Sequence, residues 1–529
     1  MMNVDYLSEN ELLKQQNKVL QNEIEELKKV IDILRGQMFL AQHKRFGASS
    51  EQTNAGQLSL FEGDVFNEAE KEKDSLLPEP ELEEIIYKRK KQKGKREQDF
   101  SVFPVERIEY DIPVNERDCP VCGCSMHQCG HDVVRKELKV IPKQFSVVEH
   151  VQAVYSCRHC EQNDINTPML KAPTPKPLIS GSGIASASLA ADIANNKFSL
   201  SIPLYRQEKE LKNNGVNLSR QTMANWLIYI YEHYFKSFID LLMLNLLAHD
   251  VLHGDETTVQ VLHEDGKKAQ SKSYMWVTRT SGESKTPIVL FKYSPNRSAD
   301  NPDEIFRNYN GYLHTDGYQA YRGIDGVTVV GCFAHVRRYY FDSLKSLPAD
   351  VQQASPANKG VRYCDALFAL EKKYDEENLT FDGRKEQREL RSKPLAEEFF
   401  AWAEAELRKC INPNGAFGTA LKYTVNQKEY LKNFFLDGRL ELSNNRVENA
   451  IRPFALGRKN WLFCNSVNGA DTSAAFYSII ETAKANGLKP YEYMNFLLER
   501  LPDLPPEKYY ELLPWNPNIP NICKTPVKS

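Results

Sequence analysis

Two pairs of cysteines constrain this chain more than any other feature of its sequence. Cys119 and Cys122 form one C-x-x-C pair, and Cys157 and Cys160 form a second, with 34 residues between the pairs. Each pair can hold one side of a tetrahedral zinc ion. Six of the eleven cysteines lie in this stretch, and four thiols without a metal would not explain the paired spacing. We therefore expect a structural Zn²⁺ bound by these four residues.

Other ligands and the local fold follow from the same stretch. Two further cysteines and two histidines are competing ligands: Cys124, His127, Cys129 and His131. A set drawn only from the four cysteines of residues 119–129 would be too cramped for a tetrahedron. The Val-rich segments 136–141 and 145–155 alternate in hydropathy and predict strands. We expect residues 101–170 to form a small zinc-binding β module stapled by the metal.

The sequence shows no sign of export or of a membrane span. There is no stretch of about 18 apolar residues, and the N-terminus is polar and acidic rather than basic and then apolar. The odd number of cysteines also argues against a disulfide framework. We therefore expect a cytoplasmic protein. Its 529 residues exceed what one hydrophobic core supports, so we expect three or more domains.

The first 45 residues carry a heptad repeat. Leucine recurs at every seventh residue, and Asn or Ile fills the other seam position: Leu13, Asn17, Leu20, Ile24, Leu27, Ile31 and Leu34. This pattern favours a parallel two-stranded coiled coil, in which Asn17 specifies the register. We expect self-association through a leucine zipper at 1–45. A helix packed on its own protein is the alternative.

Residues 46–100 predict a linker whose charge changes sign. Residues 62–84 contain ten acidic and two basic residues, whereas seven of the nine residues 88–96 are Lys or Arg. The net charge of −3 hides this segregation. A basic run of this density favours contact with nucleic-acid phosphates through counterion release. The alternative is a solvated linker.

Residues 171–245 predict a helical region with a helix-turn-helix. One helix is expected at 202–212, ended by Gly215, and Ser219 is placed to cap the next helix. An apolar stripe follows at helical spacing: Met223, Trp226, Leu227 and Ile230. The other face carries side chains suited to reading the major groove of DNA, namely Arg220, Gln221 and Asn225. An ordinary helical hairpin is the alternative.

Residues 246–345 alternate between strands and connecting segments. Strands are expected at 251–261, 273–280, 287–293, 311–315 and 327–332, with helical segments between and after the last two. This order predicts an α/β region with a mixed sheet. Asp255 and Asp316 stand at strand positions, each followed or preceded by glycine, although strands disfavour Asp. A third acid, Glu448, lies further along the chain.

Three converging carboxylates would have a clear chemical use. They repel one another unless a cation is present, and Mg²⁺ or Mn²⁺ prefers oxygen ligands. Two such ions can serve both the attacking and the leaving oxygen of a phosphoryl transfer. Simpler interpretations exist. Asp316 could be only part of a turn, and Glu448 could only cap a helix N-terminus. The neighbouring Glu256 could take the place of Asp255 as the functional acid.

Four motifs surround these acids. They are His253-Gly-Asp-Glu-Thr-Thr258, His314-Thr-Asp-Gly-Tyr318, Cys332-Phe-Ala-His335-Val-Arg-Arg338 and the long segment from Asn444 to Trp461. Together they resemble the motifs of bacterial insertion-sequence transposases, specifically the large transposase of the insertion-sequence sixty-six family. The resemblance covers nearly the whole chain, from the heptad repeat to the closing Leu513-Pro-Trp-Asn516.

The resemblance implies a DDE transposase with an RNase H-like catalytic core. Its catalytic and Mg²⁺-binding triad would be Asp255, Asp316 and Glu448. The activity implied is metal-dependent cleavage at the element ends, followed by strand transfer to target DNA. The resemblance also implies that this core is interrupted between Asp316 and Glu448, which lie 132 positions apart. The helical pattern at 366–376, 393–409 and 427–435 is consistent with an inserted helical domain at 346–440. The core then resumes at 441–485, and a C-terminal helix and tail occupy 486–529.

Basic residues near these motifs are expected to hold DNA phosphates. They are His335, Arg337, Arg338, Arg446, Arg452, Arg458 and Lys459, and pairing on the surface or in the core is the alternative for each. The implied partners are the element ends, target DNA and other element-encoded proteins, and DNA-bound protein would lie on the bacterial nucleoid. Three rivals stay open: an RNase H-like nuclease that does not join strands, a non-catalytic DNA-binding repressor, and a decayed element copy.

Overall fold

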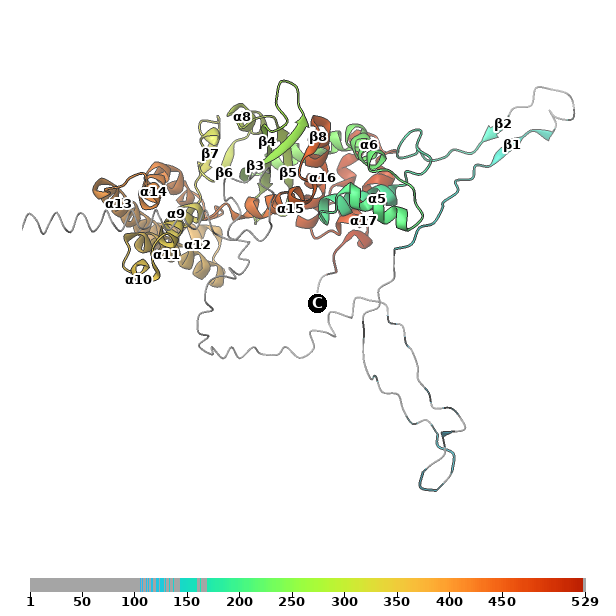
Figure 1. The fold of residues 1–529 in the computed structure, drawn as a ribbon, viewed down its shortest axis with the longest axis horizontal. Coiled ribbons are helices and arrows are strands. Elements are labelled where there is room, and N and C mark those ends of the chain that lie inside the picture. Colours follow the sequence, from blue (N-terminus) through green and yellow to red (C-terminus); the bar gives the residue numbers. More distant parts are fainter. Residues whose placement is uncertain are drawn as a thin grey trace, which may run out of the picture. The chain divides into compact units, whose positions relative to one another are not determined.

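The computed structural model describes residues 143–158 and 169–526, with isolated positions between 105 and 137 and at 162. The heptad repeat and the charged linker lie outside the described residues, so the expectations for them stay predictions. The described chain divides into a large unit at 177–524 and a small unit within 76–176, and Figure 1 colours both along the sequence.

The small unit contains a short hairpin. Strand β1 (Val154–Ser156) pairs antiparallel with β2 (Met169–Lys171), and Tyr155 lies opposite Leu170. Cys122 and Cys157 are exposed, whereas Cys119 and Cys160 fall outside the described residues.

The strand predicted at 145–155 is wrong over most of its length. Residues 143–153 have no regular structure, and only the last two predicted positions belong to β1. Three valines of this segment are exposed, namely Val147, Val148 and Val151. Alternating hydropathy favours a strand only where one face is half-buried against neighbours. These valines have no such buried face, so their pattern alone was misleading.

The large unit opens with a run of helices. Its elements are α4 (Ala187–Ala194), the π-helical turn η2 (Asn195–Ser199), α5 (Leu204–Asn213), α6 (Arg220–Ile230), the π-helical turn η3 (Tyr231–Phe235) and α7 (Lys236–Leu247). Gly215 in the turn has a φ of 83°, and the Ser219 hydroxyl accepts the Thr222 N–H to cap α6. The apolar stripe of α6 is buried. The predicted pair of helices, their turn and their cap are therefore confirmed.

A six-stranded mixed sheet follows. Its strands are β3 (Val251–His263), β4 (Lys272–Thr280), β5 (Val289–Ser294), β6 (Gly311–His314), β7 (Val327–Val330) and β8 (Cys464–Ser466). The order is β5-β4-β3-β6-β7, and β8 pairs with β3. The β3–β4 and β4–β5 pairs are antiparallel, whereas β3–β6, β6–β7 and β3–β8 are parallel. This confirms the predicted mixed sheet.

Helix α16 (Val467–Ala485) closes the β5 edge of the sheet. The Phe291 N–H donates to Ser478 Oγ at 2.8 Å, and the Val289 N–H donates to Thr482 Oγ1 at 3.0 Å. An open edge strand presents unpaired N–H groups that invite pairing with another chain. Two hydroxyls placed four residues apart on one helix face remove that liability here. Helix α17 (Pro490–Arg500) and the 3₁₀ turns η7 (Pro506–Leu512) and η8 (Asn521–Cys523) follow.

A block of helices, residues 333–435, lies in sequence between β7 and α15 (Asn445–Trp461). It comprises α9 (Phe333–Lys345), α10 (Ala349–Gln352), α11 (Pro356–Glu376), α12 (Phe381–Gln387), η5 (Arg388–Ser392), α13 (Lys393–Lys409), α14 (Ala416–Lys432) and η6 (Asn433–Phe435). Its apolar faces form a second core around Tyr340, Phe399 and Phe434. Figure 1 shows these helices gathered beside β6 and β7. The predicted helices within 366–435 are confirmed.

A buried ion pair ties this helical block to the chain that leads into α15. Arg388 donates to both carboxylate oxygens of Glu371, at 2.9 and 2.7 Å, and to the carbonyls of Asp437 and Leu440. Its guanidinium also lies 3.8 Å from the ring centroid of Phe434. A buried charge is tolerated only when it is paired in this way.

In the described part of the chain, no helix combines the length and the apolar character needed to cross a bilayer.

Candidate active site

Two copies of a His-x-Asp sequence occupy neighbouring parallel strands. His253 of β3 lies opposite His314 of β6, so Asp255 and Asp316, each two residues further on, come to the same level of the sheet. Because side chains alternate between the faces of a strand with a period of two, Asp255 leaves β3 on the side of His253, and Asp316 lies in the turn that follows β6. On the far side of β6, strand β7 ends at Val330, which pairs with His314, and Cys332 follows as the N-cap of α9.

Asp255 is buried among other acids. It is 4% exposed, and its Oδ1 accepts the Glu256 N–H at 2.7 Å. Burial raises the pKa of Asp255 well above its ordinary value, and the negative charges of Asp316, Glu256 and Glu448 raise it further. Carboxylates that repel one another in this way are stabilised by a cation. The site therefore favours cation binding.

Asp316 stands in a tight turn that the helical block braces. Its Oδ1 accepts the Tyr318 N–H at 2.9 Å, and Gly317 has a φ of 96°, which side-chain-bearing residues rarely adopt. From α14, the Tyr423 hydroxyl donates to the Asp316 carbonyl, and Gln427 Nε2 donates to the Gly317 carbonyl at 3.2 Å. The turn interpretation of Asp316 is thus correct, and it is compatible with a role in the site.

Glu448 approaches from the first turn of α15. Its Oε2 accepts from Arg338 Nη2 at 3.2 Å, and its Oε1 lies 3.7 Å from His335 Nδ1. The carboxylate therefore faces α9, whereas the capping alternative required it to fold back onto its own helix N-terminus.

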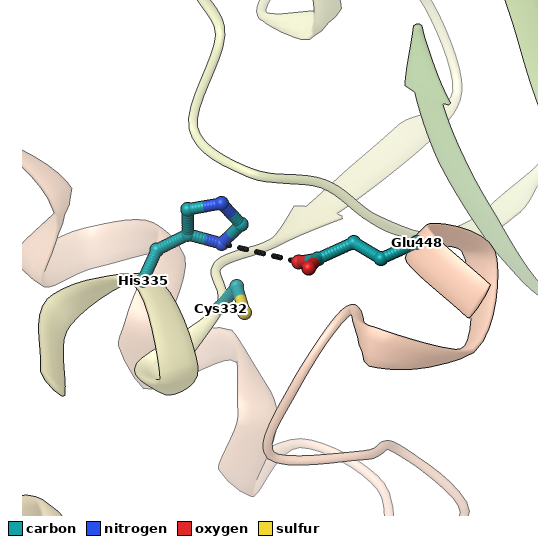
Figure 2. A group of neighbouring side chains, drawn as sticks. All are labelled: Cys332, His335 and Glu448. Atoms are coloured by element: carbon teal, nitrogen blue, oxygen red, sulfur yellow. Dashed lines mark ion pairs between the residues drawn. The ribbon is translucent and has the colours of Figure 1, made fainter. Parts of the chain in front are cut away.

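Figure 2 shows Glu448 pointing toward His335, with Cys332 beside them. Cys332 is the N-cap of α9 and His335 lies in its first turn, so the Cys-x-x-His spacing places both on one side of the helix. The Asn444 N–H donates to Cys332 Sγ at 3.1 Å. One ligand atom from each of Cys332, His335 and Glu448 lies within 4.8 Å of the others. Although burial opposes the charged imidazole, Cys332 and Glu448 raise the pKa of His335 to about 9.

The two histidines of the His-x-Asp repeats stack beside the carboxylates. Their ring centroids are 4.4 Å apart and both residues are fully buried. Burial, and then the neighbouring His253, lowers the pKa of His314 well below its ordinary value. Asn444 links this layer to α15, because its Oδ1 lies 3.0 Å from His253 Nδ1 and its Nδ2 donates to the Gly254 carbonyl at 3.0 Å.

Sequence reasoning missed the positioning role of His253, His314 and Asn444. The available signal was the repeat itself, a histidine two residues before each aspartate. Residues spaced by two on parallel strands form layers, so a repeated pair predicts a second layer under the first.

Glu256, the rival of Asp255, has partners of its own. Its Oε1 accepts from Arg297 Nε at 2.6 Å, and its Oε2 accepts from the Tyr321 hydroxyl at 2.8 Å. Burial, and then Asp316, raises the pKa of Glu256 to about 7, against the opposing effect of Arg297 and Tyr321. Through these contacts Glu256 links β3 to Arg297 and Tyr321, and both of its carboxylate oxygens are occupied by hydrogen bonds.

The predicted phosphate contacts fall into different environments. Arg338 lies at the site on Glu448. Arg446 is 45% exposed and donates to Glu441, and Arg337 donates to Asp365 at 2.6 Å. Arg452 is half-buried and Lys459 is exposed.

Arg458 is placed differently from these residues. It is only 5% exposed and donates to Thr258 Oγ1 at 3.0 Å, and burial lowers its pKa to about 10. Arg458 therefore pairs within the core, which was the alternative to a phosphate contact.

On α6, the predicted DNA-reading side chains are all exposed: Arg220, Gln221 and Asn225. Gln221 Nε2 donates to Asn225 Oδ1 at 3.0 Å, one helical turn away. Two amides held together on an open helix face can present donors and acceptors to a base edge. Their role in DNA reading stays a prediction.

Family comparisons cover the chain almost from end to end. The family model described as Transposase IS66 family matches residues 182–472. The IS66 C-terminal element matches 478–515, the zinc-finger binding domain of transposase IS66 matches 116–161, and the Transposase C of IS166 homeodomain matches 33–108. The zinc-finger match contains both C-x-x-C pairs and supports a structural zinc there.

Two relatives in Sinorhizobium fredii match most of this chain. Uncharacterized protein y4hP is 31% identical over 431 residues, which cover 78% of this chain and 74% of the relative. Uncharacterized protein y4jD is 27% identical over 515 residues, which cover 94% of this chain and 97% of the relative. Because the IS66 model spans more than half of the chain and y4hP matches over more than two thirds of it, the chain belongs to the IS66 transposase family.

Proposed function

We propose that this chain is a DDE transposase that cuts DNA at insertion-sequence ends and transfers the freed strands to target DNA. The observation that carries the proposal is the convergence of Asp255, Asp316 and Glu448. Asp255 lies within β3, Asp316 follows the neighbouring parallel strand β6, and Glu448 comes from the first turn of α15. Their negative charges act together on Asp255, as expected of ligands to a shared cation.

The donor set fits a hard divalent ion, Mg²⁺ or Mn²⁺. All three ligands offer carboxylate oxygens, and Glu448 Oε1 is buried without a hydrogen-bond partner among the described residues. Asp255, Asp316 and Glu448 would hold the ions, which supply Lewis-acid stabilisation to the attacking and leaving oxygens of a phosphodiester.

The surrounding residues hold this arrangement in place. Arg338 orients Glu448 through its Oε2, and Tyr423 with Gln427 fixes the backbone of the Asp316 turn. Productive geometry must be maintained to about 0.5 Å, so these contacts belong to the function as much as the carboxylates do. Exposed Arg446, near Glu448 on α15, is placed to contact a DNA phosphate.

We also propose that the catalytic sheet is RNase H-like and that the helical block is an insertion within it. The support is the order β5-β4-β3-β6-β7, with three antiparallel strands followed by two parallel ones. The acids lie on β3, after β6 and on α15, and the helical block separates the last two.

The other modules complete the proposal. The zinc module and the exposed face of α6 bind DNA, the N-terminal heptads pair two copies, and other element-encoded proteins assist. Such a protein works in the bacterial cytoplasm, on the nucleoid. Holding two DNA ends is the reason a pairing segment suits this activity.

The test uses full-length protein and labelled DNA that carries the element's own ends, with Mg²⁺ or with EDTA. Wild type is compared with Glu448→Gln and with the control Glu429→Gln, whose side chain is 81% exposed on α14. We expect metal-dependent nicking at the end and then a joined product, for wild type and control but not for Glu448→Gln.

Other outcomes would favour the rivals. Cleavage that never leads to joining favours the nuclease alternative. Specific binding without cleavage in Mg²⁺ or Mn²⁺, unchanged by Asp255→Ala, favours a DNA-binding repressor. Equal cleavage by wild type and Glu448→Gln would refute the triad.

A further inference from the structure

Cys332, His335 and Glu448 form a donor set of a different chemical kind from the carboxylate triad. It contains one sulfur, one imidazole nitrogen and one carboxylate oxygen, all within 4.8 Å of one another. Thiolate and imidazole ligands select Zn²⁺ and similar ions, whereas carboxylate and water suit Mg²⁺. We propose that these three residues form a second metal site, specific for Zn²⁺, which shares Glu448 with the catalytic site.

The geometry supports this assignment. His335 Nδ1 and Glu448 Oε1 face each other at 3.7 Å, as Figure 2 shows. Ligand atoms of a tetrahedral zinc site lie about 3.4–3.6 Å apart, given Zn–N and Zn–O lengths near 2.0–2.2 Å and Zn–S near 2.3 Å. A shift of a few tenths of an ångström therefore brings these two atoms to ligand spacing.

The hydrogen bonding supports it as well. Neither His335 Nδ1 nor Glu448 Oε1 has a hydrogen-bond partner within the described part of the chain, although both atoms are buried. Buried polar atoms are normally satisfied, and a shared cation would satisfy both. Cys332 Sγ accepts the Asn444 N–H at 3.1 Å, and Cys332 is the N-cap of α9, three residues before His335, so the helix start holds the sulfur and the imidazole on one side.

The remaining contacts of Glu448 leave its Oε1 atom available to bind a metal ion. Arg338 holds Oε2, and Oε1 is turned to His335. Zn²⁺ can therefore bind Oε1 without displacing Arg338. Three protein ligands leave one position of the tetrahedron for water.

Sharing Glu448 has a consequence for activity, and this part rests on the proposed function. Zn²⁺ on Cys332 and His335 draws Oε1 away from Asp255 and Asp316, so it competes with Mg²⁺ for the same carboxylate. We infer that Zn²⁺ inhibits the Mg²⁺-dependent reaction through Cys332.

Metal binding is tested without any activity measurement. Full-length protein with its zinc module already loaded is titrated with Co²⁺, and the thiolate-to-cobalt absorption is followed. Wild type should gain one additional equivalent. Cys332→Ser should lose the thiolate band, whereas the control Cys523→Ser, also at a fully buried thiol, should keep it. His335→Gln retains the sulfur and should bind Co²⁺ at least about 100-fold more weakly, since even outer-shell partners are worth 10–100-fold.

The outcomes separate the two proposals. Identical Co²⁺ spectra for wild type and Cys332→Ser, with His335→Gln binding as tightly as wild type, would overturn the metal site. In the cleavage assay with Mg²⁺, Zn²⁺ should inhibit wild type at concentrations at least tenfold below those that inhibit Cys332→Ser. Equal inhibition of the two proteins would overturn the shared-ligand inference. Co²⁺ binding by a wild-type protein that never cleaves DNA would leave the metal site intact and refute the transposase proposal alone.

Discussion

Asp316 depends on side chains more than a hundred residues away in sequence. Tyr423 and Gln427 of α14 bond the carbonyls of Asp316 and Gly317. A methyl group at position 317 would lie 2.7 Å from Gln427 Nε2 and 2.9 Å from the Tyr423 hydroxyl. The turn that carries Asp316 is therefore held by side chains of the helical block as well as by its own backbone hydrogen bond. Its conformation depends on the position of that block.

Replacing Tyr423 with Phe should slow cleavage without weakening DNA binding. The change removes one hydrogen bond and keeps the ring, which lies 4.6 Å from the ring of Tyr339. A net loss of about 1 kcal/mol in positioning corresponds to roughly fivefold in rate. Single-turnover cleavage in Mg²⁺ measures this, with Tyr363→Phe in the same helical block as the matched control. Equal slowing by both changes would mean a general loss of stability.

Arg388 should be among the most sensitive residues for folding. Arg388→Leu leaves the Glu371 carboxylate buried without its main partner, and breaking such a pair costs about 3–5 kcal/mol. Urea unfolding would measure it. The control is Lys393→Ala, which breaks an exposed pair with Glu389 and should cost less than about 1 kcal/mol. Partial recovery in Arg388→Leu/Glu371→Leu would identify the unpaired charge as the cause, and no recovery would contradict it.

For single residues, the sequence was most informative where the type of side chain is unusual for its expected position. Asp at a strand position is unfavourable enough to stand out, so the sequence makes Asp255 and Asp316 candidates. The family resemblance assigns them to one site, and the pairing of β3 with β6 brings their segments side by side. Arg458 and Arg446 look alike in sequence, yet one is buried on Thr258 and the other is half-exposed on Glu441. Burial of a long side chain depends on tertiary contacts that spacing does not encode.

Among the elements, α16 performs a task usual for a neighbouring strand. Its hydroxyls satisfy two backbone N–H groups of β5, and Thr482 Oγ1 also donates to the Val289 carbonyl at 2.9 Å. The sheet therefore ends in a helix-capped edge. This explains why residues as polar as Ser478 and Thr482 are fully buried.

Removing both hydroxyls should loosen β5 specifically. In Ser478→Ala/Thr482→Val two buried N–H groups lose their acceptors, at about 1–3 kcal/mol each. Hydrogen exchange should accelerate in residues 289–294 well before it does in β3. Ser473→Ala is the control, because that hydroxyl bonds Gly469 O within its own helix. Unchanged exchange in β5 would show that water replaces the hydroxyls.

Element prediction succeeded where hydrophobic periodicity is reinforced by a buried face. The strands of the sheet and the helix at 393–409 lie close to their expected bounds. The segment 145–153 has the same alternation and no strand, because local pattern cannot show whether a packing surface exists. Strand order was equally out of reach, since the β3–β6 pairing joins segments about 60 residues apart.

For the whole molecule, the main expectation is independence of the two units. The large unit has its own cores, whereas the described residues of the small unit are mostly exposed. A small module whose described residues are mostly exposed should draw its stability from its metal, worth about 10–16 kcal/mol for structural zinc at pH 7.

Cys122→Ser should therefore unfold the small unit and leave the large one intact. Limited proteolysis should cut the variant within 101–170 and spare 177–524, and the thermal unfolding of the large unit should be unchanged. The control Cys410→Ser, at a half-buried cysteine of the large unit, should leave the small unit resistant. A coordinated loss of both units in Cys122→Ser would show that they fold together.

Because α15 follows the helical block in the sequence, Glu448 is synthesised well after Asp255 and Asp316. Glu448 emerges from the ribosome 132 residues after Asp316, which takes about 7–26 s at 5–20 residues per second. Throughout that interval the nascent protein carries two of the three acids of the proposed triad. On the proposed function, a message broken before codon 448 yields a product that keeps the proposed DNA-binding segments and lacks Glu448, so it should compete with the full-length protein for element DNA without cutting it.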